Sequence, residues 1–118
     1  MCIFCKIVDG EIPSNKILEN EEFIAFHDIN PAAPIHVLVI PKEHIESFND
    51  ISAQTMAKMT PFIQEVTKKL ALDISGYRLI TNIGKDGGQE VNHLHFHILG
   101  GGKLIWKHYQ KNDPHKSL

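Results

Sequence analysis

Hydrophobic and polar positions follow two different periods along this 118-residue chain, and each period predicts a class of element. Apolar residues at three- and four-residue spacing indicate helices, whereas strict alternation indicates strands with one buried face. The helical spacing occurs over residues 2–8 and again from Ser52 to near Leu70. Strand-like runs occur over residues 16–19, 23–28, 36–40, 77–81 and 93–99. The pattern predicts five strands, one long helix and a short N-terminal helix.

Turn and cap residues separate these segments. Gly10 follows the first helix, where a left-handed residue commonly ends a helix. Asn20 and Glu21 are typical of a hairpin turn, and Ser52 is a typical N-cap for the long helix. Pro61 lies within the long helix and is expected to kink it. Strands before and after one long helix predict an α+β fold with an antiparallel sheet of about five strands.

The length and composition fit one domain over residues 1–118, without repeats or a linker. The net charge of −2 argues against a polymeric nucleic-acid partner. The sequence shows neither a membrane-length apolar run nor a secretory signal, so we expect a cytoplasmic protein. The polar tail at 101–118 carries apolar residues that we expect to dock, on a second subunit in one interpretation: Leu104, Ile105, Trp106 and Tyr109.

Three of the eight histidines occupy alternate positions in one predicted strand, at His93, His95 and His97. A strand sends alternate side chains to the same face, so the pattern predicts a row of imidazoles. Imidazole can act near neutral pH as a nucleophile, acid, base or metal ligand. The row is therefore compatible with solvated side chains, with a zinc site, or with covalent catalysis.

Two further segments suggest ligand binding. Backbone N–H groups of the loop Asp86-Gly87-Gly88-Gln89 could hold a phosphate, although two glycines also occur in ordinary turns. The two cysteines form a C-x-x-C pair, Cys2 and Cys5, which is typical of metal or redox sites in a reducing compartment. The alternative is two free buried thiols. Composition does not choose the accompanying imidazoles among four candidates: His27, His36, His44 and His93.

The segment QEVNHLHFHILGG resembles the signature of the histidine triad family. The upstream residues 26–29, Pro34, His36 and the run 39–42 are similar to the first half of the same pattern, so the resemblance extends over nearly the whole chain. Within the family, the chain resembles the Hint branch of homodimeric nucleoside phosphoramidases and nucleotidyl hydrolases. The resemblance implies a histidine triad fold and a purine nucleotide conjugate, of AMP or GMP, as substrate.

The resemblance also implies roles for the catalytic residues. His95 would attack the α-phosphorus and form a nucleotidyl-histidine intermediate. His36 would help to orient the nucleophile, and His97 would contact the phosphate and stabilise the transition state. Glu90 stands where animal relatives carry a serine implicated in protonating the leaving amine, so this step is a point of difference.

Nucleotide-binding residues follow from the same resemblance. Asp28 would accept the ribose hydroxyls, although on sequence alone it is equally a turn residue before Asn30. The residues implied to enclose the base are Phe4, Ile7, Phe26, His27 and Ile29. Those implied on the phosphate side are Asn82, Gly88, Gln89 and Val91, together with His95 and His97.

Zinc-containing relatives imply a metal site as well. Cys2, Cys5, His44 and His93 would complete a closed tetrahedral zinc site, which has no open position and so is structural. No catalytic metal is then required. The alternatives are a dinucleoside polyphosphate hydrolase resembling the Fhit branch, a nucleotide-binding module without turnover, and a zinc hydrolase with the triad as ligands.

Overall fold

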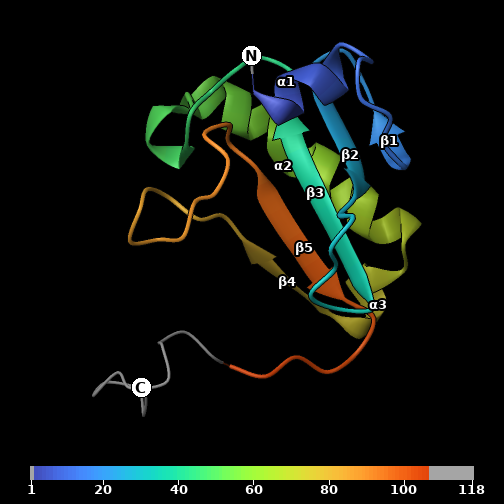
Figure 1. Cartoon of the computed structure of the whole chain (residues 1–118). Helices are drawn as coiled ribbons and strands as arrows, with labels where there is room; N and C mark the ends of the chain where they lie inside the picture. Colours follow the sequence, from blue (N-terminus) through green and yellow to red (C-terminus); the bar gives the residue numbers. More distant parts are fainter. Residues whose placement is uncertain (1, 107–118) are drawn as a thin grey trace.

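A five-stranded antiparallel sheet with helices on both faces forms the molecule (Figure 1). The computed structural model describes residues 2–106. In chain order the elements are helix α1 (Ile3–Val8), strands β1 (Lys16–Glu19), β2 (Phe23–His27) and β3 (Ile35–Pro41), the 3-10 helix η1 (Phe48–Asp50), helices α2 (Ala53–Lys69) and α3 (Leu72–Ser75), and strands β4 (Tyr77–Ile80) and β5 (Phe96–Gly100). The predicted α+β class is confirmed, with the two short helices η1 and α3 in addition.

The strand order is β1-β2-β3-β5-β4, and every neighbouring pair is antiparallel. Strand β5 therefore lies beside β3, although a long helix separates them in sequence. Val39 pairs with Phe96 and Leu38 with His97, which fixes the register between these two strands. Strand β4 is at one edge of the sheet.

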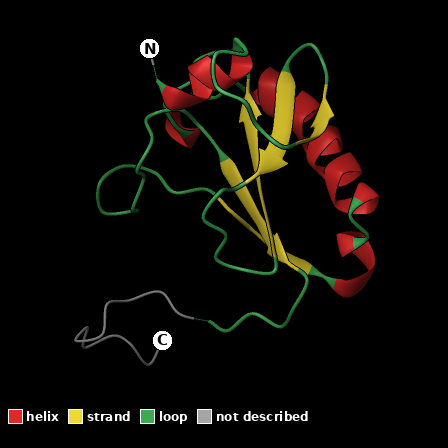
Figure 2. Cartoon of the chain, turned by 45° about the vertical axis from the view of Figure 1, so that its right-hand side comes forward, coloured by secondary structure: helices red, strands yellow, loops and turns green. Residues whose placement is uncertain are grey.

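Each face of the sheet has its own apolar cluster because side chains alternate along the strands. Val37 and Val39 of β3 face α2, whereas Leu38 and Ile40 face α1. Figure 2 shows α2 running along one face, with α1 close to the opposite one. The cluster on the α1 side contains Phe4, Ile7, Ile24, Phe26, Leu38 and Ile40.

The helix ends agree with the sequence signals. The Ser52 hydroxyl accepts a hydrogen bond from the Thr55 N–H at 3.0 Å and so caps α2. Helix α2 then continues through Pro61 to Lys69. Gly10 follows α1 with φ +79°, the left-handed conformation expected there. In the part of the chain that the structure describes, no helix is long and apolar enough to cross a membrane.

The last strand is shorter than the sequence pattern predicts. It begins at Phe96, so the prediction of a regular strand from His93 is wrong for its first three residues. The carbonyl of Pro41, at the end of β3, accepts a hydrogen bond from the His93 ring at 2.8 Å instead of from a strand N–H. Leu94 N–H donates to Ile45 O at 2.6 Å, outside the sheet. Loop and side-chain contacts, and not strand pairing, therefore hold residues 93–95.

Candidate active site and metal centre

His95 is oriented by a main-chain carbonyl. Its Nδ1 lies 2.7 Å from the carbonyl oxygen of His93, and a carbonyl only accepts hydrogen bonds, so Nδ1 carries the proton in the neutral ring. The lone pair is then on Nε2. The residue is 6% exposed, and the Phe4 ring contacts it edge-on with centroids 5.0 Å apart. His95 thus combines a fixed tautomer with an apolar neighbour, as a nucleophile requires.

His36 and His97 form an imidazole pair whose tautomers are also fixed. The Ala32 N–H donates to His36 Nδ1 at 3.0 Å, so the proton of neutral His36 is on Nε2. That Nε2–H donates to His97 Nδ1 at 2.9 Å, which leaves the proton of His97 on its own Nε2. The Ala32 N–H, 65 residues earlier in the chain, therefore sets the tautomer of His36, and His36 sets that of His97. As a result, His97 Nε2 is a hydrogen-bond donor.

Both imidazoles of this pair are held neutral. Burial, followed by the charges of His95 and His36, lowers the pKa of His97 from 6.5 to about 4. Burial also lowers the pKa of His36, against the opposing charge of Asp28. Both rings are therefore uncharged at neutral pH. The pair offers a neutral donor, not a cation.

Asp28 makes the turn contact that its sequence position suggested and also lies near His36. Its Oδ1 accepts the Asn30 N–H at 2.8 Å, which is a turn contact, and its Oδ2 lies 3.5 Å from His36 Nε2. Asp28, His36 and His97 are close enough to hold a metal ion. However, the hydrogen bonds above place a proton on His36 Nε2, the atom that would face such an ion. We therefore interpret this cluster as a hydrogen-bonded pair beside a carboxylate.

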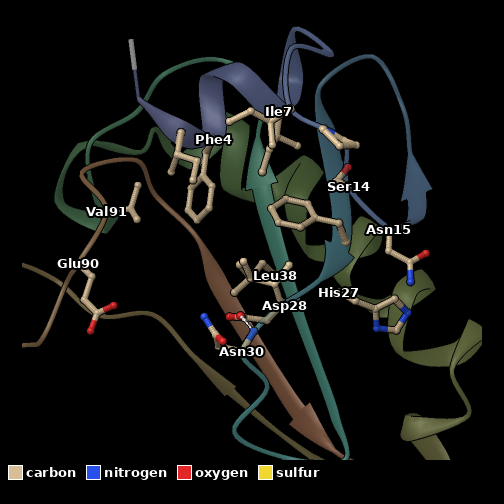
Figure 3. A pocket seen from close by; sticks show the side chains of 15 residues that line it. Phe4, Ile7, Ser14, Asn15, His27, Asp28, Asn30, Leu38, Glu90 and Val91 are labelled. Atoms are coloured by element: carbon tan, nitrogen blue, oxygen red, sulfur yellow. Dashed lines mark hydrogen bonds between the residues drawn. The ribbon is translucent and has the colours of Figure 1, made fainter.

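A pocket of about 870 Å³ opens between α1, β2 and the segment before β5 (Figure 3). Phe4 and Phe26 meet edge-to-face in its wall with centroids 5.9 Å apart. The other apolar lining includes Ile7, Leu38 and Val91, and Asp28 and Glu90 supply the acidic groups. A slot of this size with aromatic walls and few polar groups suits a flat ring system carrying a polar substituent.

The sequence-predicted base residues are placed unequally around this pocket. Phe4, Ile7 and Phe26 are buried in its wall, whereas Ile29 is 90% exposed at its rim. His27 also borders the pocket, but it pairs with Val37 and so shares the sheet face of α2. Figure 3 shows its ring turned away from Phe4. Residues that the sequence did not single out are Ile3, Ile12, Pro13, Ser14, Asn15, Asn30 and Leu38.

Several of these omissions carry a usable signal. Leu38 lies two residues after His36 on β3, so strand alternation places both on one face. Ser14 and Asn15 belong to the connection before β1, which carries no motif. Their position beside β2 is set by a long-range contact, since His27 N–H donates to Asn15 O at 3.0 Å. Such a contact is not visible in local sequence.

The predicted phosphate-side loop is held by Gln89. Its side-chain oxygen accepts the Gly84 N–H at 3.0 Å, and its amide nitrogen donates to Glu46 O at 2.7 Å and to Val91 O at 3.0 Å. A side chain at Gly87 would collide with the backbone oxygen of Ile83. The loop residues Asn82, Gly88 and Gln89 are not part of the pocket wall, whereas Glu90 and Val91 are. Gln89 therefore shapes the loop, and its amide is already bonded.

Cys2, Cys5, His44 and His93 converge into a candidate metal centre. The sulfur to Nδ1 distances are 3.6 and 3.3 Å from Cys2 to His44 and His93, and 3.2 and 3.5 Å from Cys5. Ligands of one tetrahedral zinc ion are separated by about 3.3–3.8 Å, which these values approach. The two sulfurs are closer, at 2.9 Å. The cluster could bind a metal ion such as zinc.

The hydrogen bonds around the cluster also fit a cation. His93 Nε2 donates to Pro41 O, so its lone pair is on Nδ1, the atom that faces the sulfurs. The Cys5 N–H donates to Cys2 Sγ at 3.1 Å. Burial and the neighbouring Cys2 raise the pKa of the Cys5 thiol, so two thiolates this close need a positive charge between them. The same His93 holds His95 through its carbonyl, which joins the two sites.

Comparisons with known proteins agree with this geometry. Residues 9–104 match the HIT domain. An uncharacterized HIT-like protein of Helicobacter pylori is 59% identical over 103 residues, which are 87% of this chain and 99% of that protein. The crystal structure of a HIT family hydrolase from Legionella pneumophila is 41% identical with TM-score 0.85, covering 90% of this chain and 97% of that one. That of a histidine triad nucleotide-binding protein from Candida albicans is 36% identical with TM-score 0.78, covering 92% and 87%. The chain belongs to the HIT, or histidine triad, family.

Proposed function

We propose that this chain hydrolyses the phosphorus–nitrogen bond of purine nucleoside 5′-phosphoramidates through a covalent intermediate on His95. The observation that carries the proposal is the 2.7 Å bond from His95 Nδ1 to the His93 carbonyl, which leaves Nε2 as a free nucleophile. The family relation to a HIT hydrolase and to a nucleotide-binding protein supports both parts of the proposal.

The reaction takes two displacement steps. The lone pair of His95 Nε2 attacks the α-phosphorus, and the phosphorus–nitrogen bond breaks with its electron pair going to nitrogen. The nitrogen takes up a proton and leaves as an amine. Water then attacks the same phosphorus, the bond to His95 breaks, and the nucleoside monophosphate is released. In sum, one hydrogen of water ends on the amine and the hydroxyl on phosphorus.

His97 and His36 support the negative charge that develops on the phosphoryl oxygens. His97 Nε2–H would donate to one of these oxygens, and His36 positions the ring from behind through the 2.9 Å bond. A neutral donor fits this task, because a nucleoside 5′-phosphoramidate carries a single negative charge. The low pKa of His97 keeps the donor in one protonation state over the neutral range.

The pocket accounts for the nucleoside. A purine would lie between Phe4, Ile7 and Phe26, and the ribose hydroxyls would approach the free lone pairs of Asp28. The apolar wall favours a base over a sugar or peptide moiety. The proposed base position is compatible with conjugates of both AMP and GMP. Ile29, His27 and Val91 would lie at the border of the pocket.

We also propose that the Cys/His cluster holds zinc in a structural role. Four protein ligands close the tetrahedral shell, so the ion supplies rigidity and no open position for chemistry. It would tie α1, which carries Cys5, to the segment that presents His95. The expected cytoplasmic location suits this use, since reduced thiols are retained there.

A homodimer is the proposed assembly. Strand β4 is an edge strand, and Tyr77 and Leu79 on it are 39% and 43% exposed. Ile105 and Trp106 are also exposed, at 68% and 70%, and Arg78 of the same strand contacts both. A second copy would cover this apolar edge. Tyr109, also expected to dock, is outside the described residues. Analytical ultracentrifugation at micromolar concentration tests the proposal, and a monomer would contradict it.

The activity is tested with adenosine and guanosine 5′-phosphoramidates and a diadenosine polyphosphate, incubated with wild type and His95→Ala. We expect release of the monophosphate from the phosphoramidates by wild type alone. Faster cleavage of the diadenosine compound would instead indicate a dinucleoside polyphosphate hydrolase. Binding without any turnover would indicate a nucleotide-binding module. Retention of full activity by His95→Ala would remove the basis of the mechanism.

A further inference from the structure

Glu90 presents an uncommitted carboxylate to the pocket. It lines the same cavity as Asp28 and Val91, and within residues 2–106 it makes neither a hydrogen bond nor an ion pair. Figure 3 shows its carboxylate across the pocket from Asn15 and His27, on the side from which the segment before β5 enters. A charged group at a cavity without a partner of its own is available to a ligand.

The main chain on both sides of Glu90 is fixed. The Gln89 amide donates to Glu46 O at 2.7 Å and to Val91 O at 3.0 Å, so the bonds bracket Glu90. Val91 packs against the apolar cluster under α1. The fold therefore sets the place on the main chain from which the exposed Glu90 side chain extends.

The charge of the pocket has one sign. Its lining contains the carboxylates of Asp28 and Glu90, and none of its described residues is a lysine or an arginine. Asp28 is already engaged by the Asn30 N–H and lies near His36. Glu90 is thus the carboxylate of the pocket lining that has no hydrogen bond or ion pair within the described residues. Such a lining repels a second anionic group and attracts a cationic one.

We propose that Glu90 selects the leaving group, favouring amines that carry a second, positive charge over neutral or anionic ones. This inference rests on the proposed function. In-line displacement places the departing nitrogen on the side of the phosphorus opposite His95 Nε2. With the base against Phe4 and Phe26 and the phosphorus beside the buried His95, the departing group would extend toward the solvent side of the pocket, where the exposed Glu90 belongs to the lining.

The expected size of the selection follows from Coulomb's law for partly exposed charges. A pair of unit charges about 6 Å apart at an effective dielectric of about 40 changes a rate constant by roughly threefold to tenfold. Attraction raises kcat/KM for the cationic substrate and repulsion lowers it for the anionic substrate. The two factors therefore multiply in the ratio of these two rate constants. Neutralising Glu90 should therefore change the cation-to-anion ratio of kcat/KM by about 10- to 100-fold.

The test uses three adenosine 5′-phosphoramidates whose leaving amines match in length: mono-linked 1,4-diaminobutane, n-pentylamine and 4-aminobutanoate. Initial rates give kcat/KM for wild type, Glu90→Gln, Glu90→Lys and the matched control Glu65→Gln. Glu65 is an exposed glutamate on α2, at the other face of the sheet, and gives the same change in net charge. Thermal melting and metal content are measured on every variant to show that each is folded.

Wild type should prefer the diamine to the aminobutanoate substrate, and added salt should weaken the preference. Glu90→Gln should reduce the ratio by about 10- to 100-fold, Glu90→Lys should reverse it, and Glu65→Gln should leave it unchanged. A proton-donating role for Glu90 would instead lower kcat/KM for all three substrates together, and an unchanged ratio overturns the proposal. Absence of a His95 adduct with every substrate would mean that the proposed function has failed, which the adduct assay reports separately from the ratio.

Discussion

Acidification should lower the free energy of unfolding of this protein through His97, and it should lower that of a His97→Gln variant less. Burial lowers the pKa of His97 to about 4 in the folded protein, whereas the unfolded chain has the ordinary value of 6.5. At pH 7 the ring is mostly neutral in both states and contributes little to the pH dependence. Between pH 6.5 and 4 the unfolded chain binds a proton that the folded protein does not, so the free energy of unfolding falls.

The magnitude follows from the two pKa values. At pH 5 the unfolded ring is almost fully protonated and the folded ring is almost fully neutral, which removes about 2 kcal/mol from the free energy of unfolding. Below pH 4 both states are protonated and the contribution, about 3 kcal/mol, no longer grows. The lowered pKa of His36 acts in the same direction. Glutamine does not titrate, and its amide can still contact His36.

Urea unfolding followed by far-UV circular dichroism at pH 7 and pH 5 measures the effect for wild type and His97→Gln. Wild type should lose about 2 kcal/mol more than the variant between the two pH values. Both proteins keep the Cys/His cluster, so acid-sensitive metal binding cancels in the comparison. Equal losses in the two proteins would show that His97 titrates normally and would refute the buried neutral donor.

Three further predictions concern the metal centre, the pair of His36 and His97, and the loop held by Gln89. Cys5→Ser should lose bound zinc, measured by elemental analysis, and several kcal/mol of stability. Chelation of the wild-type protein should lower its melting temperature. An unchanged metal content in Cys5→Ser would remove Cys5 from the ligand set. His36→Ala should lower kcat by about 10- to 100-fold with a small change in KM, because His97 loses the 2.9 Å hydrogen bond that orients it. A change in KM alone, measured by steady-state kinetics, would contradict this. Gln89→Leu removes three side-chain hydrogen bonds and should cost about 2 kcal/mol in urea unfolding; wild-type stability would mean that the loop does not depend on them.

The strands and helices were largely predictable because local pattern and burial agree. Strand alternation correctly places Leu38 and His36 on one face, and the Ser52 cap marks the start of α2. The strand at the triad was overestimated because the Pro41 carbonyl is taken by the His93 ring. That bond joins residues 52 positions apart, and no local pattern contains it.

The site was predictable in its residue types and not in its protonation. The sequence and the family resemblance indicated Cys2, Cys5, His44 and His93 together, and the structure brings these four side chains together. The tautomer of His97, by contrast, depends on a backbone N–H of Ala32 acting through His36. Hydrogen-bond direction of this kind requires coordinates. The exposure of Ile29 is likewise set by how the turn after β2 leaves the sheet.

The covalent intermediate is the central claim, and rapid-quench mass spectrometry tests it most directly. Wild type mixed with adenosine 5′-phosphoramidate and quenched within one turnover should carry one adenylyl group, mapped by peptide analysis to His95. His95→Ala, with its fold and metal content verified, should carry none and release no AMP. Turnover by wild type without a trapped adduct, or an adduct on any other residue, would contradict the account.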